Sequence, residues 1–483
     1  MASSGRVFSN LIWRFLERCG AQLVTFVVSV VLARLLDPTI YGTVALITVF
    51  TTILQVFVDS GLGASLIQKK SADDLDFSTV FYFNILVCLV LYLLMFFIAP
   101  LIASFYKNSQ MVLLIRILSL ILIISGVKNI QVSYVSRNLI FKKFFWATLV
   151  GTITASIVGI ILAYYLPYNQ KVWALVIQNL VNQTIDTIML WILVKWKPKP
   201  MFSWRRLKAL FSYGWKLSAS SFLDTGYNEL RSLVIGRVYT SADLGYYNKG
   251  RQFPQLIISN INTSIDSVLL PSMSDVQEDR NRVKAMVKRS IMVSTFIIVP
   301  AMVGLAASSP SLIHVLLTDK WLPCVLYLQI ACINFAFWPI YTANLNAIKA
   351  LGRSDLFLKM EIVKKAVGLG LLFSFVWVSI EAFAWSALIS TLFSLVVNTW
   401  PNKKLLGYSL FEQIKDMFPS IILSAIMGLV VYFIGYINGN SLKTLFLQVF
   451  LGVSIYFFGA SFFKLKAFTY AVGVIKSFSK KVK

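Results

Sequence analysis

The sequence predicts an all-α polytopic membrane protein of about 14 transmembrane helices, built as two pseudo-symmetric six-helix lobes followed by two further helices. Hydrophobic residues make up 58% of the 483 residues and charged residues only 13%, whereas soluble domains carry about a quarter charged residues. The hydrophobic residues fall in long blocks, each close to the ~20 residues with which a helix crosses a bilayer. The blocks lack the alternation of about ten residues per strand that is typical of outer-membrane barrels.

The apolar blocks give the expected order of membrane spans. They lie at 11–35, 41–66, 78–103, 111–133, 145–166, 172–194, 211–237, 246–271, 289–308, 324–348, 357–378, 382–399, 418–436 and 444–463. Charged residues interrupt the first block, which continues through Leu36 without an early cleavage site, so we expect a retained helix rather than a signal peptide. No connection is long enough for a soluble domain, so we expect the chemistry within the helix bundle or at its mouths.

The formal net charge of +25 is concentrated in one set of connections. Most Lys and Arg residues outside the spans lie on the side of the two termini, above all in the 195–210 connection and the C-terminal tail. The positive-inside rule therefore predicts cytoplasmic termini and accounts for the charge without nucleic acid as a partner. Four dispersed cysteines and a single histidine, His314, predict neither a metal site nor a disulfide framework.

An internal repeat supports two related lobes. The segments VVLARLLDPTIYGTVAL and LVIGRVYTSADLGYYNK share an arginine followed eight residues later by a glycine. The pairs are Arg34 with Gly42 and Arg237 with Gly245, and the same offset aligns Asp59 with Asn262. An even number of spans separates the copies, so an axis along the membrane normal should relate them. The predicted parts are an N-terminal lobe at 1–200, a C-terminal lobe at 201–404, and two added helices with a basic cytoplasmic tail at 405–483.

Polar side chains recur at helical spacing along four of the expected spans. The stripes are Arg14, Arg18, Gln22, Thr25 and Ser29; Thr48, Thr52, Gln55 and Asp59; Ser220, Asp224, Asn228 and Arg231; and Gln252, Gln255, Ser259, Asn262 and Asp266. A charge at the bilayer centre costs at least ~2.5 kcal/mol on insertion scales. These faces should therefore line an interior that is filled with water or enclosed by protein. The pattern predicts a transporter with a polar path between its helices.

Structural explanations compete with this functional one at several positions. Arg14 and Arg18 could snorkel to lipid headgroups, with Glu17 serving only to pair with them. Arg251 begins a helix and could snorkel as well, and the repeat arginines at outer helix ends favour a structural role. Lys128 and Asp186 are each isolated on their own span and could simply pair with each other.

Three sequence stretches resemble a known family. RLLDPTIYGTVALITVF, DSGLGASLIQKK with the acidic run and FSTVFYFN that follow it, and IGRVYTSADLGYYNKGRQFPQ with VLLPSMSDVQED are similar to the polysaccharide transport family of Wzx-type flippases. This family belongs to the multidrug/oligosaccharidyl-lipid/polysaccharide exporter superfamily, and the resemblance covers about residues 1–410. It implies two lobes around a V-shaped central cavity. It also implies movement of undecaprenyl-pyrophosphate-linked oligosaccharide from the inner to the outer leaflet of a bacterial inner membrane.

A pyrophosphate–sugar headgroup is anionic and bulky, which suggests roles for the polar stripes. We expect the pyrophosphate to be held by Arg14, Arg18, Arg231 and Arg251, because a guanidinium binds phosphate through a bidentate fork. Gln22, Asn228 and Gln255 would bind sugar hydroxyls, and Glu17, Asp59, Asp224 and Asp266 would couple transport to protons or sodium. We expect no catalytic residue, resident metal or cofactor. The expected partners are lipid-linked oligosaccharide and membrane lipids, and also a polysaccharide polymerase and glycosyltransferases.

Three alternatives remain at this stage. A multidrug or cation exporter of the same superfamily would share the two-lobe plan, although cationic drugs favour an acidic lumen over one that carries as many bases as acids. A membrane glycan ligase or polymerase would need a large outer loop with catalytic residues, which the spacing of the spans does not provide. A scaffold of a glycan assembly complex would carry no transport activity at all.

Overall fold

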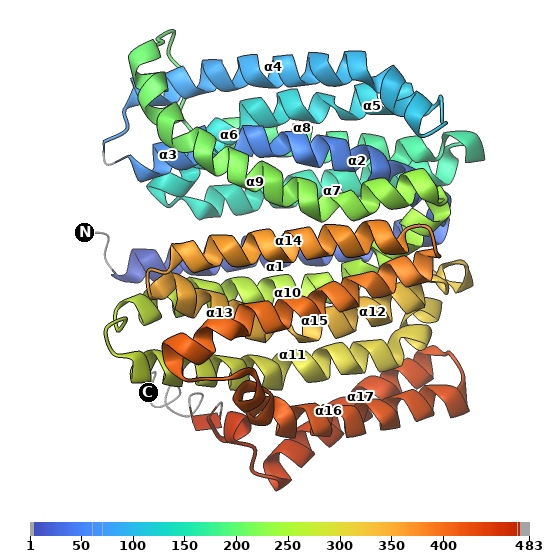
Figure 1. Cartoon of the computed structure of the whole chain (residues 1–483). Helices are drawn as coiled ribbons and strands as arrows, with labels where there is room; N and C mark the ends of the chain where they lie inside the picture. The colour runs from blue at the N-terminus through green and yellow to red at the C-terminus, as the bar shows by residue number, and fades with distance from the viewer. Residues whose placement is uncertain (1–3, 60, 70, 471, 474–483) are drawn as a thin grey trace. The chain divides into compact units, whose positions relative to one another are not determined.

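The computed structural model describes residues 4–59, 61–69, 71–470 and 472–473, and within them not the side chains of 4–12, 14–19, 59, 213, 264, 267 and 354 (Figure 1). Regular structure in the described ranges is helical throughout, without a strand. The chain forms two compact units, Met1–Gly245 and Tyr246–Lys483. Residue contacts define these units, whereas the predicted lobes follow the sequence repeat, and the lobe bounds at 200 and 404 stay a prediction.

The described residues of the first unit form nine α-helices before α10 begins. They are α1 (Ser4–Leu35), α2 (Pro38–Asp59), α3 (Leu62–Gln68), α4 (Asp74–Phe105), α5 (Met111–Leu118), α6 (Leu120–Asn138), α7 (Phe141–Tyr165), α8 (Val172–Leu193) and α9 (Trp204–Val238), with a 3-10 turn at Tyr168–Gln170. α7 packs along α8 and α1, α4 packs on α6, and α9 crosses α2 and α3. A buried cluster that includes Leu66, Phe77, Ile130 and Leu190 joins α3, α4, α6 and α8.

The second unit is built around a long central helix. Its helices are α10 (Ser241–Ser274, whose first turn belongs to the first unit), α11 (Arg280–Leu317), α12 (Cys324–Ala336), α13 (Trp338–Ala350), α14 (Ser354–Phe375), α15 (Ile380–Leu406), α16 (Leu410–Asn438) and α17 (Leu442–Phe462), with a 3-10 turn at Asp319–Trp321. α11 contacts α12, α16 and α17, so the two helices predicted as an appendage pack on this helix. Ser409 forms a capping box with Glu412 at the start of α16, which fixes where that helix begins.

The expected spans correspond to helices or to consecutive helix pairs such as α2–α3, α5–α6 and α12–α13. Within the described residues, nine segments are long and apolar enough to cross a membrane, which agrees with a multi-pass membrane protein. α1, α8, α9, α10 and α14 fall outside this set. α8, α9, α10 and α14 carry charged or amide side chains along their length, which lowers their mean hydropathy. In α1, the part with fully described side chains is a shorter apolar stretch, Gly20–Leu35. The total of 14 crossings stays a prediction.

The two glycines of the sequence repeat mark a close helix crossing within the first unit. A Cβ atom at Gly42 on α2 would lie 1.6 Å from the carbonyl oxygen of Ser241. A Cβ atom at Gly245 would lie 2.2 Å from the carbonyl oxygen of Pro38. Because nothing larger than hydrogen fits at either place, the repeat conserves a backbone contact between the first turns of α2 and α10. The turn between α9 and α10 is also shorter than expected, since α10 already begins at Ser241.

Candidate functional site

A polar cavity lies among the helices of the first unit. Its volume is about 450 Å³, within the range of small-ligand sites. α2 contributes three threonines and a glutamine, and α6, α7 and α8 contribute the other polar side chains. The lining residues are Thr48, Thr51, Thr52, Gln55, Leu118, Ile121, Lys128, Phe144, Thr148, Asn179, Asn182, Gln183 and Asp186. Hydroxyl and amide groups thus dominate the polar part of the wall, and they can both donate and accept hydrogen bonds.

One ion pair supplies the charge in this cavity. Lys128 Nζ on α6 lies 2.5 Å from Asp186 Oδ2 on α8, and the two side chains are only 17% and 7% exposed. The same ammonium donates to Gln183 Oε1 at 2.9 Å, and Gln183 Nε2 donates to Ser125 Oγ at 3.3 Å. The second carboxylate oxygen of Asp186 is buried and accepts no hydrogen bond from the described residues. Lys128 is therefore neutralised and held in place, while the second oxygen of Asp186 is left without a hydrogen bond from the described residues.

The cavity confirms part of what the sequence indicated. Thr48, Thr52 and Gln55 line one wall, as the polar stripe on the second span predicted, and Lys128 pairs with Asp186. The side chain of Asp59 lies outside the described residues. We did not predict the contribution of α8, although Asn179, Asn182 or Gln183, and Asp186 recur every three or four residues along it. That spacing was a signal for a polar face that sequence reasoning missed.

The predicted phosphate-binding residues of the first unit lie on α1 and α9. Arg14, Glu17 and Arg18 are in helix α1, but their side chains lie outside the described residues. Gln22 is half-buried on the same helix. On α9, Asp224 and Asn228 are exposed and Arg231 is half-buried, all on one continuous helix as the periodicity predicted. Their roles in substrate binding and ion coupling stay predictions.

In the second unit, a cluster of amide and hydroxyl groups surrounds Asp266 on α10. Asn346 Nδ2 on α13 donates to Asp266 Oδ1 at 2.7 Å, and Asn262 Nδ2 donates to Asp266 Oδ2 at 3.2 Å. The hydroxyl of Thr342 on α13 donates in turn to Asn262 Oδ1. Each carboxylate oxygen thus accepts from a neutral amide, and no ion pair involves Asp266 within the described part of the chain.

Arg251 and Gln255 occupy the same helix nearer its start. The Nη1 of Arg251 donates to the Tyr247 hydroxyl at 3.2 Å, and its guanidinium carbon lies 5.4 Å from the centre of that ring. Gln255 is exposed. Fifteen residues separate Arg251 from Asp266, about 22 Å along a helix axis. These two predicted residues therefore do not form one compact site, and each has local partners of its own.

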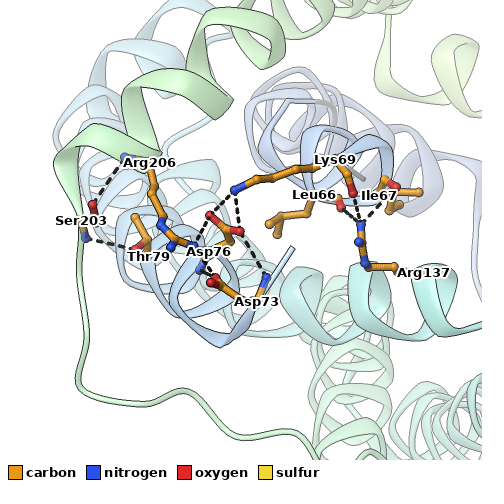
Figure 2. A network of polar contacts seen from close by, with 9 residues as sticks. All are labelled: Leu66, Ile67, Lys69, Asp73, Asp76, Thr79, Arg137, Ser203 and Arg206. Atoms are coloured by element: carbon orange, nitrogen blue, oxygen red, sulfur yellow. Dashed lines mark hydrogen bonds and ion pairs between the residues drawn. The ribbon is translucent and has the colours of Figure 1, made fainter. Parts of the chain in front are cut away.

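The motif that carried part of the resemblance forms a charged network at one end of the first unit, shown in Figure 2. Asp76 is fully buried, and Lys69 Nζ lies 2.7 and 2.6 Å from its two oxygens. Arg206 Nη1, at the start of α9, lies 2.5 Å from Asp73 Oδ1 and 3.3 Å from Asp76 Oδ1. The hydrogen bond from Arg206 lowers the pKa of Asp73 to about 2. We call Lys69, Asp73, Asp76 and Arg206 the acidic clamp.

Hydrogen bonds between side chains and the main chain extend the acidic clamp in two directions (Figure 2). Arg137 Nη1 on α6 donates to the carbonyl oxygens of Leu66 and Lys69, both at 2.6 Å, which satisfies free acceptors at the C-terminal end of α3. On the other side, the backbone N–H of Ser203 donates to Thr79 Oγ1 at 3.1 Å. The clamp thus fixes the 195–210 connection and α9 to the α3–α4 turn.

Two solved structures of membrane proteins share the fold of this chain. The structure is similar to the Lipid II flippase MurJ in an inward closed conformation, with a TM-score of 0.72 and 18% identity, over 94% of this chain and 98% of that one. It is also similar to the inward-facing conformation of a multidrug resistance MATE family transporter of the MOP superfamily. There the TM-score is 0.60 with 15% identity, over 80% of this chain and 94% of that one. At these identities, the likeness to both structures is one of fold.

Residues 31–326 match the family described as polysaccharide biosynthesis protein, and the chain belongs to that family. Among relatives, it is 24% identical to the teichuronic acid biosynthesis protein TuaB of Bacillus subtilis (strain 168), over 79% of each chain. It is 22% identical to the lipopolysaccharide biosynthesis protein WzxC of Escherichia coli (strain K12), over 69% of this chain and 68% of that one. The family that the motifs indicated is thus confirmed.

Proposed function

We propose that this protein is a flippase that moves undecaprenyl-pyrophosphate-linked oligosaccharide across the bacterial inner membrane by alternating access, for export of a cell-surface polysaccharide. The observation that carries the proposal is the family match over residues 31–326 in a chain with the fold of the Lipid II flippase MurJ. MurJ is named for a lipid-linked cargo, and the family is named for polysaccharide biosynthesis. A lipid-linked oligosaccharide is the cargo that combines the two.

The chemistry of the half-buried arginines supports an anionic headgroup. Arg231 on α9 and Arg251 on α10 each present a guanidinium group, whose planar fork matches the geometry of phosphate. Guanidinium groups can hold the two phosphates of the carrier, and the hydroxyl and amide groups of the polar cavity suit sugar hydroxyls. The apolar carrier tail can remain in the surrounding lipid.

The decisive experiment is a flipping assay with the purified full chain in proteoliposomes that contain a fluorescent undecaprenyl-pyrophosphate-linked oligosaccharide. Arg231→Ala should reduce the flipping rate at least tenfold, and Arg231→Lys should restore only part of it, because lysine lacks the bidentate fork. Arg280→Ala, at the exposed start of α11, is the matched control and should flip at the normal rate. Normal flipping by well-expressed Arg231→Ala protein would remove Arg231 from the mechanism, and no flipping by the wild type would remove the function.

For energy coupling, we propose Asp266 as the described residue best suited to exchange a proton or sodium ion. It accepts hydrogen bonds from neutral amides alone, so an ion can bind without first breaking an ion pair. Transport that is indifferent to collapse of both the proton and the sodium gradient would contradict this role. The contributions of Glu17, Asp59 and Asp224 to coupling are part of the same proposal.

The orientation and the partners follow from this function. With cytoplasmic termini, the basic 195–210 connection and the acidic clamp lie on the side where glycosyltransferases assemble the cargo. Release on the opposite side would deliver it to a polysaccharide polymerase. Accessibility of single cysteines introduced at 208 and 443, probed from each side of the membrane, tests the orientation. Labelling of 443 from the cytoplasm would reverse it.

A multidrug exporter is the second candidate, favoured by the similarity to a MATE transporter fold. Drug-sensitive cells that overproduce the chain should then gain resistance to cationic drugs. The flippase proposal instead expects unchanged drug sensitivity together with restored surface polysaccharide in a flippase-deficient strain.

A further inference from the structure

A second pocket of the first unit opens near the ends of α6 and α8 and the start of α7, apart from the polar cavity. Its volume is about 620 Å³. We call it the lysine pocket, because four of its ten lining residues are lysines. The lining consists of Asp74, Tyr134, Asn138, Ile140, Lys143, Lys195, Trp196, Lys197, Pro198 and Lys199. Three of the lysines lie on the five-residue segment 195–199, which begins just after Val194, the residue that caps α8.

Contacts on several sides hold this segment in place. The indole Nε1 of Trp196 donates to Asp74 Oδ1 at 3.1 Å, and the Trp196 carbonyl accepts from Gln131 Nε2 at 3.1 Å. The Trp196 ring stacks on Tyr134, with ring centres 6.1 Å apart and 27° between the planes. The backbone N–H of Lys199 donates to Ser78 Oγ at 3.0 Å. The lysines therefore extend from a fixed backbone, and a ligand need not order that backbone first.

The charges in the pocket do not cancel. Lys199 Nζ lies 2.7 Å from Asp74 Oδ2, and this pair accounts for the carboxylate in the lining. No ion pair involves Lys143, Lys195 or Lys197 within the part of the chain that the structure describes. Three ammonium groups around one concave site form a site for an anion, and lysine ammonium groups bind phosphate as point charges. One phosphodiester would leave two of these charges unbalanced, so a ligand with two phosphates fits better.

Apolar side chains next to the pocket favour a lipid over a soluble anion. Ile188 and Ile192 lie four residues apart on one face of α8, just before Lys195, and are 48% and 67% exposed. Trp146 lies one turn beyond Lys143 on α7 and is 47% exposed. α7 and α8 thus carry exposed apolar side chains within about two turns of Lys143 and Lys195 along the chain, a surface that suits acyl chains. Indole rings also favour the interface between headgroups and acyl chains.

We infer that the lysine pocket binds the headgroup of a two-phosphate anionic phospholipid of the cardiolipin type, with its acyl chains along α7 and α8. Basic pockets between helices at a membrane surface suit such headgroups. Each lysine near an anionic lipid surface contributes about a fivefold change in affinity. The site would hold a structural or regulatory lipid that is not the transported cargo, so the inference does not rest on the proposed function.

The test measures cardiolipin binding to the full chain by native mass spectrometry and by the shift of its thermal unfolding. Protein in detergent is titrated with tetraoleoyl cardiolipin, dioleoyl phosphatidylglycerol or inorganic phosphate. We expect cardiolipin to bind more tightly than phosphatidylglycerol and to raise the unfolding temperature, with no effect of phosphate at millimolar concentration. Replacing Lys143, Lys195 and Lys197 together by Gln should weaken cardiolipin binding at least tenfold, whereas replacing all three by Arg should retain it.

The matched control is the triple replacement of Lys403, Lys404 and Lys415 by Gln. These exposed residues of the second unit lie in connections predicted on the same membrane face, so the control removes the same charge elsewhere. It should bind cardiolipin as the wild type does. Equal loss of binding in both triple variants would mean general attraction to a basic surface and would overturn the pocket. Protection by inorganic phosphate as strong as that by cardiolipin, or displacement of cardiolipin by undecaprenyl pyrophosphate, would overturn the lipid assignment.

Discussion

Two carboxylates inside the helical units, Asp186 of the first unit and Asp266 of the second, are balanced in different ways. Asp186 faces an ammonium at 2.5 Å and lines a cavity of about 450 Å³. Asp266 accepts two hydrogen bonds from the neutral amides of Asn262 and Asn346, and no ion pair involves it within the described residues. Both residues can be identified in the sequence as acids within apolar blocks. Only the structure shows that one has a cationic partner and the other has neutral amide partners.

The difference indicates a division of roles. Removing one partner of a buried ion pair leaves an uncompensated charge, so Lys128 and Asp186 are expected to stay together and to shape the cavity. A carboxylate held by amides can gain a cation or a proton while its neighbours only reorient. We therefore interpret Asp186 as a structural charge with one oxygen that accepts no hydrogen bond, and Asp266 as the carboxylate that exchanges an ion. Variants of both residues can test this difference.

The largest effect should come from breaking the ion pair. Asp186→Ala leaves Lys128, which is only 17% exposed, without its counter-charge. We expect a loss of about 3–5 kcal/mol in the free energy of unfolding. Thermal unfolding of the protein in nanodiscs measures this loss. Lys128→Met combined with Asp186→Ala removes the stranded charge and should recover most of the stability.

Asp355→Ala provides the control for that measurement. Asp355 pairs with Arg353 at 2.8 Å, but their side chains are 51% and 44% exposed, so the change should have little effect on the free energy of unfolding. A similar loss for Asp186→Ala and Asp355→Ala would show that the cavity pair is solvated. The contrast drawn with Asp266 would then disappear.

The next largest effect concerns Gly42 and Gly245, the glycines of the sequence repeat. Substituting them tests whether equivalent positions of the two copies have the same structural role. Gly42→Ala and Gly245→Ala each place a methyl group within 2.2 Å of a backbone oxygen, so backbone must shift. We expect each to destabilise the protein by about 1–3 kcal/mol. Gly370→Ala on α14 has nothing within 4 Å and should be neutral or slightly stabilising. Chemical unfolding measures the free energy of unfolding of the three variants. If only Gly42→Ala left that free energy unchanged, the two copies of the repeat would not have the same role.

Much of the fold could be predicted because it depends on local periodicity. Apolar blocks of bilayer length became helices, and the repeat of Arg34 and Gly42 in Arg237 and Gly245 pointed to a real backbone crossing. The polar face of α2 was also readable, since residues three and four apart share a helix face. Family membership followed from motifs that the comparisons confirm.

The site was less predictable because its contacts join distant parts of the chain. Asp73 meets Arg206 across 133 positions, and Asp266 meets Asn346 across 80. Helical periodicity says which face is polar, but not which other helix covers that face. The acidic run after DSGLGASLIQKK therefore served as a family signature in the sequence, whereas the structure gives it a physical role in fixing the α3–α4 turn to α9.

A smaller effect on stability, with a large one on transport, should follow Asp266→Asn. The asparagine keeps the shape of the side chain and can still accept one hydrogen bond from Asn262 or Asn346, so the free energy of unfolding should change by less than about 1 kcal/mol. If Asp266 exchanges the coupling ion, flipping in proteoliposomes should no longer respond to an imposed proton or sodium gradient. A variant that still responds would exclude Asp266 from coupling. Asp266 would then be a structural acid like Asp186.

The smallest effect is the pH dependence of Asp73, the exposed acid of the acidic clamp. Arg206 lowers the pKa of Asp73 to about 2, below the value of ~3.9 in an unfolded chain. A lowered folded-state pKa means that the contribution of Asp73 to stability is complete above about pH 4 and is lost as the pH falls toward 2. Thermal unfolding of Asp73→Asn should therefore differ from that of the wild type by a constant amount from pH 7 to pH 4, and the difference should shrink below pH 4. The difference in unfolding temperature should stay small because Asp73 is 56% exposed. A difference that vanished between pH 7 and pH 5 would show that Arg206 does not bind this carboxylate.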